Sequence, residues 1–561
     1  MSDKQSLKEI VHRSYAAPPK YSEIAPGVPE DYKQIQTLGQ LLELSYRHAS
    51  IEEQIRGNLL QKRKRNEDPY QGIIGYDEDV IPATDRAILA GHDIIYIGEI
   101  GQAKTKLAET IANNLLSSIP QIKGCVIHDI PTSLPEEQMA ASLAGEDPLH
   151  TSPEFHICNE CEQKIRDGKL ETPIDWVGGM DRYRYVLATP DISIKDLVGQ
   201  IDAIKIAKKG VEIYSIESYS PGQLLQSRHG MLCIDELPVL DPRKQVALLS
   251  VLQEGKFTTG AYPVTFKPES RIIATANPID YTHSGKIIEP LFDRLRSHID
   301  THYPTTVEQE MSIMVQEAKM NDGKAFLPIF MLKTVARITH MARSHPDVNR
   351  EKGVSVRMSI HGLELLMGEA FRTRRAYYDD VPSIPRPCDI HCVQQASKFE
   401  LSEVEDNREN RKKVLEQLIE DALRTTALEY VSGLSQEQLT AMKNEFAGNK
   451  VFEASQNVLG SRSDGGGAAD YLGQLDKFPS LRQMVAEVAE RVKKEQLEFI
   501  EDLRRHKIES EVLSVRENGD NNNNMDGGEF TASVTELVLE GLRWLKPPVV
   551  DKKEKGYVSS T

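Results

Sequence analysis

Gly98-Glu99-Ile100-Gly101-Gln102-Ala103-Lys104-Thr105 is the stretch of sequence that decides the fold, and it follows directly on the apolar run Ile94–Ile97. An apolar strand that opens into a glycine-containing turn, a lysine and a hydroxyl residue is typical of a phosphate-binding loop. Backbone N–H groups of such a loop point at phosphate oxygens. We therefore predict that this loop and Lys106 contact a nucleotide, with Lys104 reaching the β- and γ-phosphates and the Thr105 hydroxyl binding Mg²⁺.

One position departs from the usual pattern G-x-x-x-x-G-K-S/T, because Ala103 stands where the second glycine is expected. A methyl group is tolerated there provided that the residue has an ordinary negative φ. We expect that conformation, and hence unimpaired ATP binding.

The bulk composition limits the classes of protein to consider. A chain of 561 residues with 39% apolar content can bury more than one core, so two or three domains are expected. A formal net charge of −17 argues against a protein that coats nucleic acid or a membrane surface. No apolar window approaches the roughly 18 residues of a membrane helix, and no apolar signal core opens the chain, which favours a cytoplasmic location. Six cysteines are too few for a disulfide scaffold and indicate free thiols or a metal site.

Short apolar runs alternate with longer amphipathic ones between residues 73 and 304, which predicts an α/β domain with a mainly parallel sheet. The strand candidates are Ile94–Ile97, Tyr185–Ala188, Met231–Ile234 and Arg271–Thr275. Polar residues follow each of these strands, at the edge where α/β folds bind ligands.

Two carboxylates follow the apolar run Met231–Ile234. We expect Asp235 to hold Mg²⁺, directly or through water, and Glu236 to polarise the attacking water. Asn277 follows the next strand, where it can hydrogen-bond both the γ-phosphate and the water. An Asx turn before Pro278 is the structural alternative for Asn277.

Two arginines are candidates for stabilising transition-state charge. Arg294, in Asp293-Arg294-Leu295, is placed to act on the nucleotide of a neighbouring subunit, with Arg296 and Lys286 as alternatives. An ion pair with Asp293 on a surface helix is the structural alternative. Arg357 heads a helix of a predicted smaller domain that would close onto the nucleotide, although it can also be a plain helix-start residue.

The order of these motifs, ending in a helical domain with its own arginine, resembles that of AAA+ ATPases. Alanine before Lys104-Thr105 resembles the MoxR and magnesium-chelatase I-subunit branch. The resemblance covers roughly residues 70–385 and implies a P-loop AAA+ core followed by a small helical lid domain and a largely helical C-terminal region. It also implies a ring, usually a hexamer, with ATP at the subunit interfaces, and it places the adenine against Ile74 and Gly75.

The distance of 131 positions from Lys104 to Asp235 (235 − 104) leaves room for an insertion. A C-x-x-H pair, Cys125 and His128, and a C-x-x-C pair, Cys158 and Cys161, supply enough ligands for tetrahedral Zn²⁺. His150 or His156 can replace a member of this set, and Cys125 can instead be an apolar strand residue.

The predicted order of parts is as follows: an N-terminal helical extension over 1–70, an α/β nucleotide-binding domain over 71–304 with an insertion at about 121–184, a helical lid over 305–400, a helical C-terminal region over 401–516 with a glycine-rich linker near 460–467, a disordered spacer over 517–529, and a terminal helix and tail over 530–561.

Four functions are compatible with these motifs. The leading hypothesis is an ATP-hydrolysing ring that remodels or activates a protein client or a metal-handling complex. A magnesium-chelatase motor subunit acting with partner subunits on a porphyrin is the second, and the divergent C-terminal region argues against it. A scaffold that binds ATP without hydrolysing it is disfavoured by Glu236. A DNA-associated regulator, such as a sigma-54-type activator, is disfavoured by the acidic balance and by the lack of a Gly-Ala-Phe-Thr-Gly-Ala loop.

Overall fold

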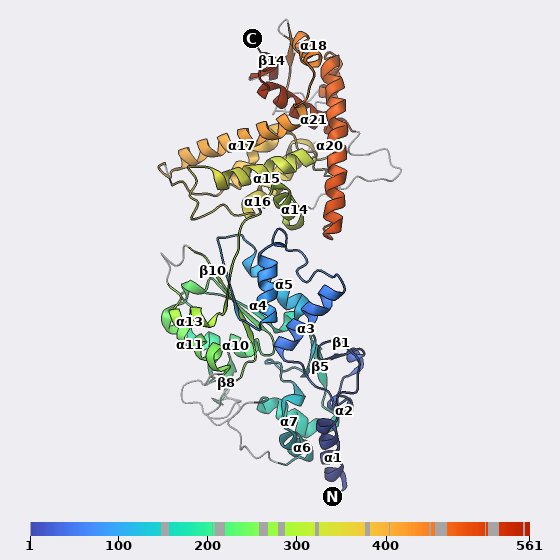
Figure 1. Cartoon of the computed structure of the whole chain (residues 1–561), viewed down its shortest axis with the longest axis vertical. Coiled ribbons are helices and arrows are strands. Elements are labelled where there is room, and N and C mark those ends of the chain that lie inside the picture. The colour runs from blue at the N-terminus through green and yellow to red at the C-terminus, as the bar shows by residue number, and fades with distance from the viewer. Residues whose placement is uncertain are drawn as a thin grey trace. The chain divides into compact units, whose positions relative to one another are not determined.

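The computed structural model describes residues 2–146, 156–202, 204, 206–207, 219–256, 267–278, 286–319, 325–375, 382–402, 404–447, 450–454, 468–510, 512–513, 527–553 and 556–560. Contacts divide the chain into two compact units (Figure 1). The first comprises residues 1–99 and 103–301, and the second comprises residues 302–561 together with 100–102. The predicted glycine-rich linker at 460–467 lies outside the described residues, as does most of the spacer at 517–529.

A five-stranded parallel sheet forms the centre of the first unit, in the order β11-β3-β10-β9-β6. Its strands are β3 (Ile94–Ile97), β6 (Tyr183–Leu187), β9 (Met231–Asp235), β10 (Arg271–Ala276) and β11 (Ser297–Asp300). The predicted α/β class with a mainly parallel sheet is thereby confirmed. Because β3 lies beside β10 and β10 beside β9, the carboxyl ends that carry the sequence motifs lie side by side.

Apolar side chains cover both faces of this sheet, as expected for parallel strands with continuous apolar runs. Ile94 and Tyr96 share one core cluster with Leu107 and Ile111 of α5 (Lys104–Leu115). Ile95 belongs to the cluster on the other face. Figure 1 accordingly shows α4 and α5 on one side of β10 and α11 and α13 on the other.

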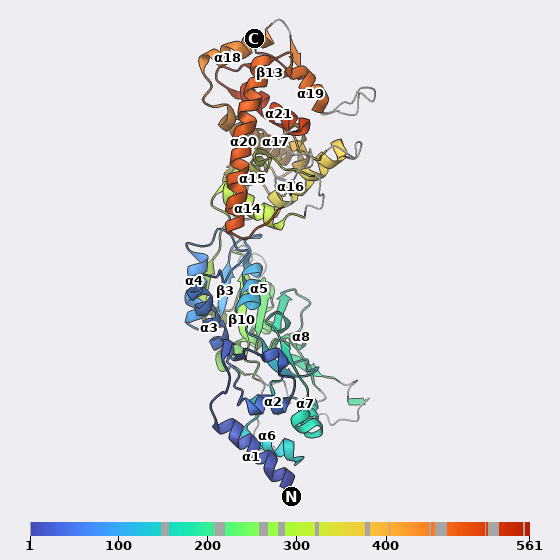
Figure 2. The same cartoon turned by 90° about the vertical axis from the view of Figure 1, so that its right-hand side faces the viewer.

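An antiparallel pair of strands, β4 (Ile119–Ile122) and β5 (Ile174–Val177), brackets a helical segment within the first unit. This segment contains α6 (Glu136–Ala144) and α7 (Asn159–Gly168). The amino-terminal helix α1 (Ser2–Ala16) lies beside α6 in both views (Figures 1 and 2). Among the described residues, the other α-helices and strands of the first unit are β1 (Glu23–Ala25), β2 (Val28–Pro29), α2 (Leu38–Glu43), α3 (Ile51–Lys64), α4 (Val80–Leu89), α8 (Ile194–Val198), β7 (Gly199–Ile201), β8 (Tyr219–Pro221), α10 (Gln223–Gln226), α11 (Pro242–Glu254) and α13 (Glu289–Arg294).

The second unit is mainly helical. The α-helices and strands found among its described residues are α14 (Val307–Glu317), α15 (Ile329–Ser344), α16 (Arg357–Ala370), α17 (Arg408–Val431), α18 (Gln436–Phe446), β12 (Val451–Phe452), α19 (Ala468–Leu475), α20 (Pro479–Arg505), α21 (Gly528–Trp544), β13 (Val550–Lys553) and β14 (Gly556–Ser559). The three strands form a small antiparallel sheet in the order β12-β14-β13. Helix α21 is buried along nearly its whole length and packs against α17, α19 and α20. The domain boundaries given above stay predictions.

Candidate nucleotide-binding site

The loop between β3 and α5 has the backbone of an anion-binding turn. Gly101 has φ +84°, and Ala103, the residue before α5, has φ +53° and ψ +18°. The expectation of a negative φ at Ala103 is therefore wrong. The turn into α5 requires the left-handed conformation, which is why a glycine is usual at this position and why alanine is strained there. Alternating backbone conformations of this kind gather N–H groups at the amino end of a helix, where anions bind.

The Lys104 ammonium lies within the curve of the loop. Its Nζ donates hydrogen bonds to the carbonyl oxygens of Gly98 (2.5 Å) and Glu99 (2.7 Å). The Gly98 N–H in turn donates to the carbonyl of Ala276, which anchors the start of the loop to the end of β10 (3.1 Å). To reach a phosphate bound in the loop, Lys104 would exchange its hydrogen bonds to these carbonyl oxygens for hydrogen bonds to phosphate oxygens.

The other residues predicted to contact the nucleotide differ in exposure. Ile100 is exposed and Gln102 is buried, while Lys106 is half-buried on α5. Ile74 and Gly75 are half-buried in the turn before α4, and Gly75 has φ +83°. Their contact with a nucleotide stays a prediction.

Asp235 is the centre of a hydrogen-bonded group at the carboxyl ends of three strands and the start of α5. Its Oδ1 accepts hydrogen bonds from the hydroxyls of Thr105 (3.1 Å) and Thr275. Its Oδ2 accepts one from the Tyr185 hydroxyl (2.8 Å). The structure therefore brings together Thr105 and Asp235, which are 130 residues apart in sequence.

The oxygen donors at this point fit Mg²⁺. The hydroxyl of Thr105 and the carboxylate of Asp235 are in direct contact, and Mg²⁺ prefers oxygen ligands from one or two protein side chains together with phosphate and water. These two residues would hold the ion.

Glu236 follows β9 in a strained backbone conformation, with φ +56° and ψ +45°. Its backbone N–H donates to the Thr275 hydroxyl at 2.9 Å. Non-glycine residues in this region of backbone space concentrate at functional sites. Asn277 follows directly on β10, whose last residue pairs with Ile97 of β3, so the amide and the phosphate-binding loop leave the sheet at the same level.

The two candidate arginines lie in different units. Arg294 ends α13, and its Nη1 is 2.6 Å from the Asp293 carboxylate, with 36% of the arginine side chain exposed. The ion pair foreseen as an alternative is therefore present. Arg357 is exposed and is the first residue of α16 in the second unit. The roles of both arginines stay predictions.

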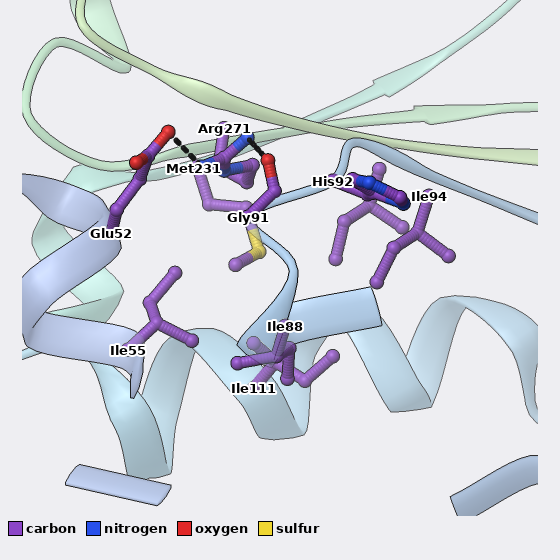
Figure 3. A pocket seen from close by; sticks show the side chains of 10 residues that line it. Glu52, Ile55, Ile88, Gly91, His92, Ile94, Ile111, Met231 and Arg271 are labelled. Atoms are coloured by element: carbon purple, nitrogen blue, oxygen red, sulfur yellow. Dashed lines mark hydrogen bonds and ion pairs between the residues drawn. The ribbon is translucent and has the colours of Figure 1, made fainter. Parts of the chain in front are cut away.

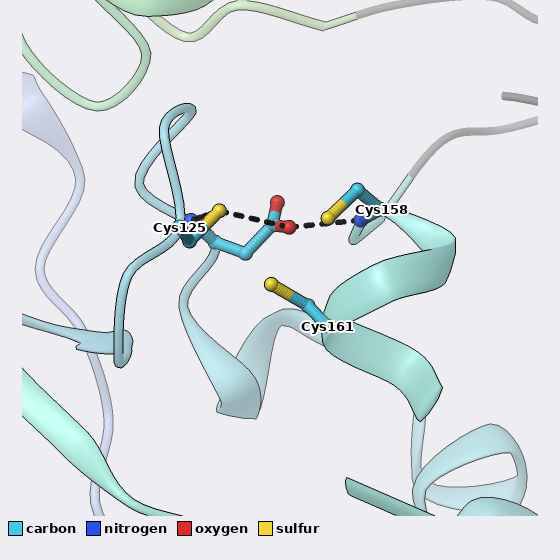
Figure 4. Close-up of side chains that lie close together, drawn as sticks. Cys125, Cys158 and Cys161 are labelled. Carbon is cyan, nitrogen blue, oxygen red and sulfur yellow. Dashed lines mark hydrogen bonds between the residues drawn. The ribbon is translucent and has the colours of Figure 1, made fainter. Parts of the chain in front are cut away.

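A second group of reactive side chains lies in the segment between β4 and β5. The ligand atoms of Cys125, Asp129, Cys158 and Cys161 all lie within 4.8 Å of one another. Figure 4 shows the three sulfur atoms turned toward a common point. Hydrogen bonds from the thiols of Cys158 and Cys161 lower the pKa of the Cys125 thiol.

His128 is not in this group, which corrects the predicted ligand set. The chain turns after Cys125 so that the Asp129 N–H donates to the Cys125 sulfur at 3.4 Å, and this turn brings the aspartate to the cysteines. The His128 ring instead lies 2.8 Å from the Gln121 side-chain oxygen through Nδ1. Burial lowers the pKa of His128 to about 4.

A small cavity of about 20 Å³ lies at the opposite edge of the sheet from the phosphate-binding loop (Figure 3). Its lining includes the first residues of β3, β9 and β10, and Arg271 crosses it to Glu52 at 2.5 Å and to the Gly91 carbonyl at 2.7 Å. A volume of this size holds about one water molecule, so we assign the cavity to packing.

Three residues of these sites were not predicted from the sequence. Thr275 and Tyr185 contact Asp235. Both belong to predicted strands, and because threonine and tyrosine are common in strands, neither was singled out as a site residue. Asp129 directly follows the predicted zinc ligand His128, but the cysteine and histidine spacing offered a complete set without it. The useful signal was a polar residue within an apolar strand, as in Ala274-Thr275-Ala276.

Comparison with known proteins finds a family model that matches part of the first unit. Residues 215–299 match the family model of the Sigma-54 interaction domain, which belongs to the AAA+ class. This segment is similar in sequence to that domain. It contains Asp235, Glu236, Asn277 and Arg294 and begins after the phosphate-binding loop.

Weaker similarities extend to a curated bacterial protein and to solved structures. The uncharacterized protein YeaC of Bacillus subtilis (strain 168) is 24% identical over 225 residues, which is 36% of this chain and 65% of YeaC. A complex of the magnesium-chelatase subunits BchI and BchD includes a chain that is 17% identical, with a TM-score of 0.30 over 60% of this chain and 97% of that one. NtrX from Brucella abortus in complex with ADP is 15% identical, with a TM-score of 0.31 over 70% of this chain and 66% of NtrX.

Within the described part of the chain, no helix combines the length and the apolarity needed to cross a membrane.

Proposed function

We propose that this chain is an ATP-hydrolysing motor of the AAA+ type that assembles into a ring and acts on a protein client.

 The expected ring is a hexamer with ATP at its subunit interfaces. The observation that carries the proposal is the contact of Asp235 with Thr105 at the end of the phosphate-binding loop, with Glu236 next in the chain. The alanine before Lys104-Thr105 supports a place in the MoxR and magnesium-chelatase I-subunit-like branch.

The residues of the site have separate roles in the proposed reaction. Backbone N–H groups of residues 101–105 and the Lys104 ammonium bind the phosphates. A bound Mg²⁺, held by Thr105 and Asp235, supplies positive charge against the phosphate oxygens. Glu236 accepts a hydrogen bond from the attacking water and orients it toward the γ-phosphate, and Asn277 donates its amide to the γ-phosphate.

The strained backbone at Glu236 supports this division of roles. The hydrogen bond from its N–H to Thr275 ties it to the same hydroxyl that donates to Asp235. The Thr275 hydroxyl therefore contacts both the carboxylate of Asp235 and the backbone of Glu236, so the two residues are positioned by one side chain.

The client-remodelling role is tested with a variant that holds ATP without hydrolysing it. Glu236→Gln keeps the size of the side chain and removes the charge that orients the water. We expect this variant, incubated with ATP, to retain a client protein that the Lys104→Ala variant does not retain, because the latter has lost the phosphate-binding ammonium. Equal recovery of proteins by both variants would contradict an ATP-dependent client interaction.

The match to the Sigma-54 interaction domain favours a DNA-associated regulator as the second candidate. Such a regulator would bring the same nucleotide-binding site to a transcription complex. ATP hydrolysis that rises on addition of a sigma-54 holoenzyme and promoter DNA would support this candidate, and an unchanged rate would exclude it. The chelatase alternative is tested in the same assay with magnesium-chelatase partner subunits and a porphyrin.

A further inference from the structure

The cysteine group between β4 and β5 unites two segments of the chain that are more than 30 residues apart. Cys125 follows β4, whereas Cys158 and Cys161 lie at and just after the start of α7. All three are free thiols, and Cys125 and Cys161 are buried within the large core cluster of the first unit. A buried carboxylate, that of Asp129, completes the group.

We propose that Cys125, Cys158, Cys161 and Asp129 bind one Zn²⁺. Three thiolates and a carboxylate oxygen are ligands that zinc takes in a tetrahedral arrangement. With Zn–S distances of about 2.3 Å, the ligand atoms of a tetrahedron lie roughly 3.8 Å apart. The four ligand atoms already lie within 4.8 Å of one another, so only small side-chain movements separate them from this geometry.

The surroundings of the group match the charge of such a site. Three thiolates and a carboxylate around Zn²⁺ carry a net charge of −2, and burial of that charge requires a positive partner. Arg228 provides it, because its guanidinium is buried and lies 2.6 Å from the Asp129 Oδ1. Its other terminal nitrogen donates to the His156 carbonyl at 2.7 Å, close to Cys158 in the chain.

Backbone N–H groups are also placed to stabilise the ligands. The Cys158 N–H donates to Asp129 Oδ2 at 2.8 Å, and the Asp129 N–H donates to the Cys125 sulfur at 3.4 Å. Hydrogen bonds of this kind orient metal ligands and favour their charged forms.

The position of Arg228 gives the metal a structural role. Arg228 lies three residues before β9, the strand that ends in Asp235. A zinc ion at this point would join β4, α7 and the start of β9 through Asp129 and Arg228. The ion would thus fasten the segment between β4 and β5 to the strand that carries the magnesium ligand.

The test is metal analysis of the full-length protein purified under reducing conditions. We expect one equivalent of zinc per chain, released by a mercurial thiol reagent. Cobalt exchanged into the site should give sulfur-to-cobalt charge-transfer bands and the intense visible bands of a tetrahedral ion. A reduced protein that neither contains zinc nor takes it up on titration would overturn the proposal.

Variants separate the proposed ligands from their neighbours. Cys158→Ser and Cys161→Ser should lose most of the zinc, whereas Cys392→Ser, which alters a cysteine of the second unit, should keep it. Asp129→Asn should weaken zinc binding by at least about tenfold. His128→Asn should leave the zinc content unchanged. Loss of zinc in His128→Asn or His150→Ala, with retention in Asp129→Asn, would overturn the assignment of Asp129.

Discussion

Ala103 shows how much a single backbone angle decides at the residue scale. An L-residue in the left-handed region is strained by roughly 1–2 kcal/mol, and glycine is not. Replacing Ala103 by glycine removes this strain, but part of the gain in folding stability is offset because glycine has more conformational freedom in the unfolded chain. We therefore expect Ala103→Gly to raise the free energy of unfolding by about 0.5–1 kcal/mol, measured by urea denaturation, with ATP binding retained.

A matched control for this change is Ala83→Gly within α4, where the Ala83 N–H donates to the Asp79 carbonyl in an ordinary helical turn. Glycine in a helix interior lowers stability by about 1 kcal/mol. The opposite signs of the two substitutions test the backbone explanation. If Ala103→Gly destabilises the protein as Ala83→Gly does, the left-handed conformation at position 103 is not the one present in solution.

Burial of His229 should make the stability of the first unit depend on pH. Burial lowers its pKa to about 3, against an ordinary value of 6.5, and outweighs the opposite effect of the Glu269 carboxylate, which lies 2.8 Å from the His229 Nδ1. The unfolded chain therefore binds a proton below pH 6.5 that the folded chain does not bind, and stability falls as the pH is lowered. Between pH 7 and pH 5 this loss is about 2 kcal/mol. Denaturation at a series of pH values, compared with His229→Asn, should show a flatter dependence for the variant, since asparagine accepts the left-handed φ of +54° at this position.

At the scale of elements, a buried ion pair connects α21 to the segment before residue 387. The Arg386 guanidinium is 2.7 Å from the Glu529 carboxylate, and both side chains are buried. Arg374 Nε also lies 3.4 Å from the Glu529 carboxylate, so removing Arg386 leaves this buried charge with one cation in place of two, at a cost of about 3 kcal/mol. We expect Arg386→Met to lower the unfolding free energy by that amount and Arg386→Met/Glu529→Gln to recover part of it.

The control is the exposed ion pair of Arg482 with Asp476, whose side chains are each 66% exposed. Arg482→Met should change stability by less than about 1 kcal/mol. Similar losses from Arg386→Met and Arg482→Met would mean that the Arg386 pair is not buried in solution.

The strands that the sequence predicted are those with unbroken apolar runs. β3, β9 and β10 are buried on both faces, so each has a continuous apolar signal. β11 has a single buried apolar residue, Ile299, and lies at the sheet edge, so its sequence Ser297-His298-Ile299-Asp300 gives no such signal. The small sheet of β12, β13 and β14 was missed for a related reason, because its strands are short and β12 pairs with β14 across about 100 residues.

The candidate site was predictable to the extent that its residues follow strands. Thr105 and Asp235 were expected near each other because parallel strands end at one edge, and they are in contact. The conformation of Ala103 and the replacement of His128 by Asp129 depend on how individual turns close. Residue type and spacing do not determine such turns.

At the scale of the whole molecule, the proposed ring makes Arg294 a residue that acts on a neighbouring subunit. An arginine that stabilises transition-state charge contributes about a thousandfold or more to the hydrolysis rate. We expect Arg294→Ala to lose activity on that scale while forming the same ATP-dependent assemblies, measured by light scattering. Arg296→Ala, which alters an exposed arginine two residues away, should have a much smaller effect. Full activity of Arg294→Ala would contradict this role and leave the surface ion pair with Asp293 as the explanation for Arg294.

The central claim is that this chain hydrolyses ATP with Glu236 orienting the water. Its most direct test is steady-state phosphate release from Mg-ATP by the wild-type chain and by Glu236→Gln, with ATP affinity measured in parallel and Glu43→Gln, an exposed glutamate at the end of α2, as control. The account predicts that Glu236→Gln binds ATP as the wild type does but releases phosphate at about a hundredth of the wild-type rate or lower. Glu43→Gln should behave as the wild type does. Hydrolysis by Glu236→Gln at the wild-type rate would contradict it.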